Sequence, residues 1–134
     1  MNELILPVHV RSSSELLKHT EGPGTRFVFS DHNNNPNGNI YTILRVVHDV
    51  DQPALHVEPH SHEFESLAVF KGFNPDLSGL VVEFLLGETW HRFESPRAVR
   101  IPAGLLHNWR YVKGSGEYWN IVLTPGADYN RTLR

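Results

Sequence analysis

The sequence contains no cysteine among its 134 residues. This absence excludes disulfide bonds, cysteine-ligated zinc and thiol catalysis, so any metal site must be built from histidine, aspartate or glutamate. The sequence also lacks an apolar stretch long enough to span a membrane, and its start shows no basic segment followed by an apolar one. We therefore expect a cytoplasmic protein with no membrane partner.

An excess of charge of one sign is also lacking. Twelve Lys and Arg residues stand against fifteen Asp and Glu residues, which gives a formal net charge of −3, and the basic residues form no run. Nucleic-acid-binding domains usually carry a basic patch, so we expect no nucleic-acid partner. At this length the chain is predicted to form one domain over residues 1–134 with a core of its own.

Helical patterns are scarce in this sequence. The best candidate starts at residues 12–14, with Glu15 as a capping-box residue, and stops by Gly22. Elsewhere short β-rich runs alternate with turn residues, which is typical of an all-β sandwich or barrel. Strands are expected over residues 26–29, 40–47, 64–70, 80–86, 98–101, 106–112 and 118–124, with turns at 37–38, 102–104 and 113–116. So many strands favour a closed barrel, because closure removes exposed edges.

The N-terminal segment, residues 1–25, is set apart from a barrel predicted over roughly 26–125. Its runs at 4–6 and 8–10 are apolar enough to form a strand within the chain or to cover a sheet face of a second copy. A barrel this short often pairs with itself, so we expect a homodimer.

Two short segments concentrate residues that bind metals. Residues 59–65 contain two histidines and two glutamates, and residues 102–107 end in a third histidine, which gives the set His60, His62, Glu63, Glu65 and His107. Imidazole nitrogens and carboxylate oxygens are ligands for divalent transition metals. Residues at i and i+2 of a strand share a face, so His60 and His62 can point inward together. In a regular strand both glutamates would face outward, whereas a bulge after His62 would turn Glu65 inward. The spacing leaves open which glutamate would bind.

These residues resemble the two motifs of the cupin superfamily, small β-barrels that usually hold one metal ion. The first motif places Glu after a His-x-His pair and then Gly after six intervening residues, matched here by His60, His62, Glu65 and Gly72. The second is Pro-x-Gly followed after two residues by His, matched by Pro102, Gly104 and His107. The resemblance covers roughly residues 40–125.

The chain departs from the cupin pattern at four places. Ala54 and Pro96 stand where the two motifs begin with Gly, Tyr111 replaces a final Asn, and only two residues separate His62 from Glu65 instead of three or four. The resemblance implies an all-β, single-domain barrel of the jelly-roll type. It also implies one divalent metal ion per chain, held by His60, His62, Glu65 and His107.

The resemblance implies a metal-dependent enzyme that acts on a small-molecule substrate. Fe(II) is the favoured metal, and with it an oxygenase of the dioxygenase type. Mn, Ni, Co and Zn suit the same ligands and would support a non-redox isomerase, lyase or cyclase. A third alternative is a cupin that binds a small ligand without catalysis.

Four further residues are candidates for the pocket, and none has an assigned catalytic role. Glu63 flanks the ligands and, with Ser66, could orient an imidazole. Trp109 and Tyr111 share the face of His107 and could line the pocket or belong to the core. Asn120 lies inside an apolar strand, where a buried amide needs a partner.

Overall fold

The computed structural model describes residues 4–10, 24–52 and 59–129. Its strands are β1 (His9–Val10), β2 (Thr25–Ser30), β3 (Ile40–Asp51), β4 (Ser66–Gly72), β5 (Leu80–Leu86), β6 (Thr89–Glu94), β7 (Arg97–Ile101) and β8 (His107–Leu123), followed by a 3₁₀ turn, η2 (Pro125–Ala127). The helix expected after residue 12 lies outside the described residues. Within these ranges, no helix has the length and apolar character needed to cross a membrane.

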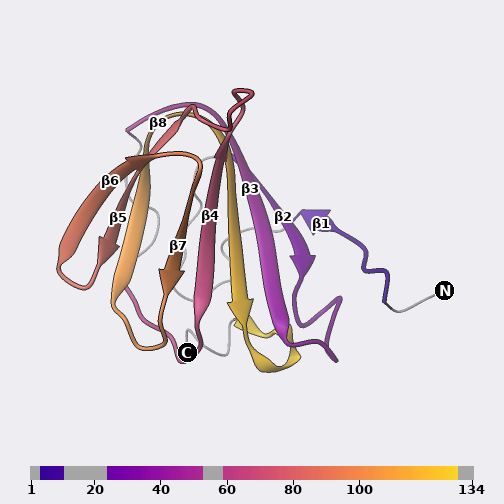
Figure 1. Ribbon diagram of the computed structural model, residues 1–134. Coiled ribbons are helices and arrows are strands. Elements are labelled where there is room, and N and C mark those ends of the chain that lie inside the picture. Colours follow the sequence, from indigo (N-terminus) through magenta and orange to yellow (C-terminus); the bar gives the residue numbers. More distant parts are fainter. Residues whose placement is uncertain (1–3, 11–23, 53–58, 130–134) are drawn as a thin grey trace.

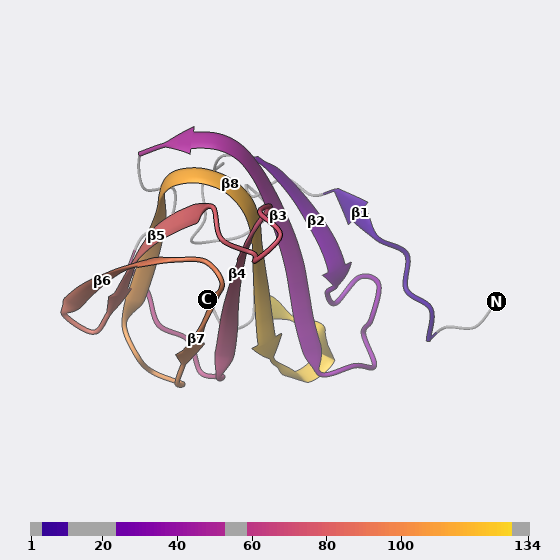
Figure 2. The ribbon, with the colours of Figure 1, turned by 45° about the horizontal axis from the view of Figure 1, so that its top comes forward.

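The strands form one strongly curved antiparallel sheet (Figures 1 and 2). Its order is β1-β2-β3-β8-β4-β7, and the β5–β6 hairpin is attached through β5 to β8. In both views the β5–β6 hairpin and β1 lie at opposite sides of the molecule. The prediction of an all-β fold of the jelly-roll type is confirmed. Among the described strands, however, no ladder joins the two ends of this path to complete a barrel.

Strand β8 is the longest element and belongs to both halves of the sheet. Its first part, from His107, pairs with β5, and its second part, up to Leu123, pairs with β3 and β4. The turn predicted at residues 113–116 is wrong, because the strand continues through them. A Cβ atom on Gly114 would lie 2.0 Å from the Gly79 carbonyl oxygen, and one on Gly116 would lie 2.2 Å from that of Lys71. These glycines allow close approach of neighbouring strands instead of reversing the chain.

Strand β6 was not expected from the sequence. It pairs with β5 from Val81 opposite Glu94 to Leu86 opposite Thr89. Only Phe93 of its side chains is partly buried, so the strand lacks the alternation by which strands are recognised. The available signal was the two-residue connection at 87–88, where Gly87 has a φ of 64°, a conformation typical of tight hairpins.

Alternate side chains of the paired strands form the core. On β4 and β8, Phe70 and Tyr118 stack with ring centroids 5.2 Å apart, and Trp109 lies 5.2 Å from Phe70 and 4.4 Å from Tyr118. Such offset and edge-on contacts are favourable for aromatic rings. Trp109 also borders the pocket described below, so the core fixes one wall of the site.

The N-terminal strand pairs within the chain. His9 and Val10 of β1 lie opposite Val28 and Phe27 of β2, and β2 pairs antiparallel with β3, as expected for two strands joined by the turn predicted at residues 37–38. Residues 9 and 10 therefore form an intrachain strand. The homodimer stays a prediction.

Candidate metal centre

The backbone brings His60 and His107 directly opposite each other. The His60 N–H donates to the His107 carbonyl at 3.0 Å, and the His107 N–H donates to the His60 carbonyl at 2.9 Å. Two residues that exchange both bonds form an antiparallel pair whose side chains lie on one face. His107 is the first residue of β8, so the second motif is fixed to the first by main-chain bonds.

A tight turn extends this pairing to His62. The Leu105 N–H donates to the Pro102 carbonyl at 3.2 Å, and Gly104 has a φ of 81°, a conformation that glycine adopts readily in such turns. The Gly104 N–H then donates to the His62 carbonyl at 2.9 Å. The turn predicted at residues 102–104 is confirmed, and it aligns the two histidine segments.

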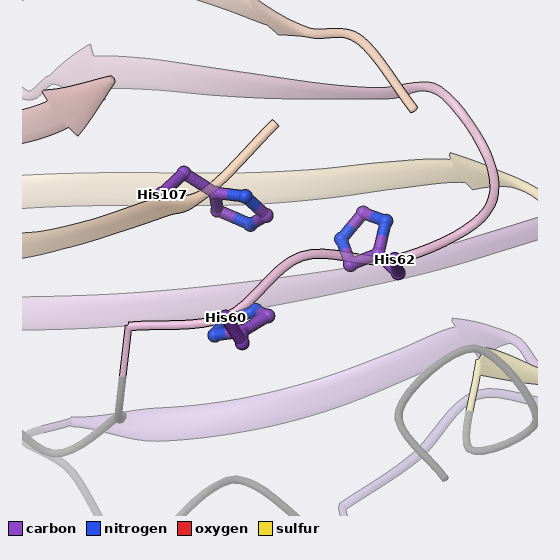
Figure 3. Close-up of side chains that lie close together, drawn as sticks. All are labelled: His60, His62 and His107. Carbon is purple, nitrogen blue, oxygen red and sulfur yellow. The ribbon is translucent and has the colours of Figure 1, made fainter. Parts of the chain in front are cut away.

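The three imidazoles converge in the structure (Figure 3). Ring centroids lie 4.5 Å apart for His60 and His107, 5.0 Å for His62 and His107, and 5.8 Å for His60 and His62. One nitrogen from each ring lies within 4.8 Å of the others. Imidazole nitrogens bind Zn²⁺ at about 2.0–2.1 Å, so two ligands of one ion lie up to roughly 4.2 Å apart. A small rotation of the rings would therefore suit one divalent ion.

Two of the rings are oriented by the main chain. His62 Nδ1 lies 3.0 Å from the Phe64 carbonyl oxygen, and His107 Nδ1 lies 2.9 Å from that of Leu105. A neutral imidazole that donates from Nδ1 presents the lone pair of Nε2 to a metal. This arrangement is the one commonly found behind metal-binding histidines.

Burial favours the neutral form of both rings. It lowers the pKa of His62, and the nearby His60 adds a smaller effect in the same direction. Burial likewise lowers the pKa of His107 to about 4, with smaller contributions from His60 and His62. Because only a neutral imidazole binds a metal ion, these shifts keep the rings ready to bind at neutral pH.

The histidines open onto a pocket with an empty volume of about 300 Å³, part of which is open to solvent. It is lined by His60, His62, Ser66, Ile101, His107, Trp109, Tyr118, Asn120 and Tyr129. Of the expected pocket residues, Trp109 and Asn120 border it, whereas Tyr111 is buried in the core and Glu63 is exposed.

The structure does not bring Glu65 to the histidines. Its carboxylate instead binds Arg100 outside the pocket, and both side chains are substantially exposed. Burial alternates without a bulge from this point, so Ser66 and Ala68 face inward and Leu67 faces outward. With three residues after His62, as in the cupin motif, the glutamate position would be residue 66, and Ser66 stands there. Within the described ranges, the group that could hold a metal ion consists of the three histidines.

Sequence reasoning missed one wall of the pocket. The Tyr129 ring lies 5.6 Å from that of His62, edge-on, and stacks on Tyr41 at 4.6 Å. It follows the 3₁₀ turn η2, beyond the last strand, where no strand or helix periodicity indicates which side chains face inward. Tyr118, in contrast, could have been found because it shares the face of Asn120 on β8.

No family model and no curated protein matches the chain. Several solved structures do. KdgF from Halomonas sp. is similar with a TM-score of 0.55 and 17% identity, over 84% of this chain and 90% of that one. A variant of oxalate decarboxylase from Bacillus subtilis gives a TM-score of 0.58 at 14% identity, over 92% of this chain and 31% of that one.

A further structure of the Bacillus subtilis enzyme, described for its Mn(II) centres, gives a TM-score of 0.57 at 14% identity with the same coverage. The chain thus spans about a third of the length of oxalate decarboxylase, 31%. These identities establish similarity of fold. With the jelly-roll arrangement of the strands and the three clustered histidines, they confirm the expected resemblance: the chain has the fold of the cupin proteins.

Proposed function

We propose that the protein is a metal-dependent cupin enzyme that holds one divalent transition metal ion through His60, His62 and His107. The convergence of the three imidazoles carries this proposal, because one nitrogen from each lies within 4.8 Å of the others. The main-chain bonds to two Nδ1 atoms and the lowered pKa values of the same rings support it.

A divalent ion at this position would act as a Lewis acid on a substrate oxygen or, in the case of iron, would support reaction with dioxygen. The chain itself supplies the binding site for a small molecule. Trp109, Tyr118 and Tyr129 form walls that limit access of water, and Asn120 offers an amide that can donate or accept a hydrogen bond. The size of the pocket favours a small substrate.

Lewis-acid chemistry, as in an isomerase, lyase or cyclase, is the first candidate reaction. Three neutral imidazoles leave the ion's charge uncompensated, which strengthens its pull on a substrate oxygen. Non-haem Fe(II) oxygenases commonly use two histidines and a carboxylate, and Glu65 is held by Arg100 instead. The Mn(II) centres named for oxalate decarboxylase support manganese as a metal to test.

The Fe(II)-dependent oxygenase is the second candidate. An iron ion held by the three histidines would have coordination positions left for both a substrate and dioxygen. The single test begins with metal analysis of protein purified without added metal. We expect one divalent ion per chain.

The metal-free protein is then reloaded with Fe(II), Mn(II) or Zn(II), and small hydroxy acids, keto acids and sugar acids are screened with and without oxygen. Conversion at full rate without oxygen, supported by Mn(II) or Zn(II), favours the first candidate. Oxygen consumption that requires iron favours the second. Absence of any bound metal would overturn the proposed function, and tight ligand binding unaffected by metal removal would indicate a binding protein without catalysis.

A further inference from the structure

Ser66 carries a polar group that the fold leaves facing the pocket. The residue is 3% exposed and lines the pocket beside the three histidines. Its Oγ has no hydrogen-bond partner among the described residues. Since a buried hydroxyl without a partner is unfavourable, its position needs an explanation.

The strand neighbours of Ser66 cannot supply that partner through their side chains. Ser66 lies opposite Val122 on β8 and Ile101 on β7, and both side chains are apolar. The hydroxyl can therefore be satisfied from the pocket. A second polar side chain faces the same space: Asn120 is 7% exposed and lies opposite Ala68, the next inward residue of β4.

The charges around the pocket indicate the kind of ligand. Imidazoles that bind a metal ion are neutral ligands, and the nearby carboxylate of Glu65 is bound to Arg100 outside the pocket. A divalent ion at the histidines would thus favour an anionic oxygen ligand to compensate its charge. The Ser66 O–H would be a donor to such a ligand, and bonds to a charged acceptor are the stronger kind.

We propose that Ser66 binds the substrate and selects for an anionic oxygen group, a carboxylate or an enolate, at the open side of the metal. Its hydroxyl donates to an oxygen of that group. The inference rests on the proposed function, because it requires a metal at the three histidines. It adds the substrate class and a residue that recognises it.

The test uses the full chain loaded with Zn(II) and acetohydroxamate, a small anion that chelates through two oxygens, with both affinities measured by calorimetry. Ser66→Ala should weaken acetohydroxamate binding by about tenfold to a hundredfold and leave zinc affinity within about twofold, since the ligating rings are untouched. Ser66→Thr should retain binding because it keeps the hydroxyl. Leu67→Ala, one position along on the outer face, is the matched control and should bind as the wild type does.

Two further variants keep the test decisive. Ser66→Cys preserves the shape of the side chain but donates weakly, so it should lose affinity for acetohydroxamate even if Ser66→Ala does not fold. Ser66→Glu should place a carboxylate at the metal, tighten zinc binding at least tenfold and exclude acetohydroxamate.

This inference alone would be overturned if the wild type binds zinc and the Ser66→Ala and Ser66→Cys variants bind acetohydroxamate as tightly as the wild type does. A wild-type protein that takes up no metal would overturn the proposed function and this inference with it.

Discussion

Arg26 and Arg45 lie opposite each other on β2 and β3, and both are buried, with exposed fractions of 6% and 5%. Arg26 Nη2 donates to the Tyr41 hydroxyl at 2.5 Å. Burial lowers the pKa of Arg45, and the charge of Arg26 adds a smaller effect in the same direction. Two like charges placed side by side away from water are unfavourable for folding.

Removal of one of these charges should stabilise the protein. We expect Arg26→Met to raise the free energy of unfolding by about 1 to 2 kcal/mol, because a long apolar side chain fills the space without a buried charge. Arg26→Ala should lower it, since a void is left. Urea denaturation measures both, and an equal loss of stability in the two variants would contradict the electrostatic explanation.

Metal content should depend on the histidine cluster and not on histidine in general. His60→Ala and His107→Ala should each abolish stoichiometric metal, because each removes one of three converging ligands. His91→Ala, at an exposed position on β6, is the control and should retain the ion. Metal analysis of the purified variants provides the measurement; a full complement of metal in His107→Ala would refute the ligand set.

Glu65 provides a direct comparison between the cupin motif and the structure. Since its carboxylate binds Arg100 outside the pocket, Glu65→Gln should leave the metal content unchanged. The loss of an exposed ion pair should cost no more than about 1 kcal/mol of stability. Should the variant lose its metal, the motif-based assignment of Glu65 as a ligand would be restored.

The metal-free protein should lose stability in mild acid. The pKa values of His62 and His107 lie below 6.5 in the folded state, and for His107 near 4. Below about pH 6.5 the unfolded chain binds protons that the folded chain does not, so stability present above that pH is lost as the pH falls toward 4. The lowered pKa of His107 accounts for a loss on the order of 3 kcal/mol in the free energy of unfolding.

Urea denaturation after treatment with a chelator, at pH 7 and at pH 4.5, measures this effect. His107→Gln is the control, because an amide does not titrate and the dependence on pH should become shallower. Identical pH dependence in the two proteins would contradict the role of burial. In the metal-loaded protein, protons compete with the ion for the same nitrogens, so metal should be released as the pH falls through about 6 to 5.

The glycines of β8 should not tolerate side chains. Gly116→Ala would place a Cβ atom 2.2 Å from the Lys71 carbonyl oxygen, so we expect a loss of about 2 to 3 kcal/mol as the strands separate. Lys113→Ala, at an exposed position of the same strand, should have little effect. Thermal and urea unfolding compare the two, and equal stabilities would show that the strands can shift without cost.

Much of the site could be predicted because it depends on strand alternation. The i, i+2 spacing of His60 and His62 gives both rings one face, and the turn before His107 has the residues that such a turn needs. The same alternation predicts that Glu65 faces outward, whereas the cupin motif makes it a metal ligand. In the structure Glu65 faces outward. Ser66 was seen as a supporting residue, but its place at the pocket depends on the absence of a bulge.

What could not be predicted depended on contacts distant in sequence. As residue types, the glycines at 114 and 116 suggest a turn. Only the close approach of the Gly79 and Lys71 carbonyl oxygens shows that they make room for neighbouring backbone. Strand β6 has too few buried side chains to show the alternating pattern by which a strand is recognised. Tyr129 reaches the pocket through its packing on Tyr41 and His62, which no local pattern encodes.

The position of β8 in the sequence determines when the strands can pair during synthesis of the chain. Strands β3, β4 and β5 all pair with it, yet a ribosome makes each of them before residues 107–123. Until that segment emerges, the earlier strands present unpaired edges, a state that is prone to aggregation. Because β8 also begins with His107, the emerging chain cannot complete the three-histidine cluster before the strand that unites the sheet is available.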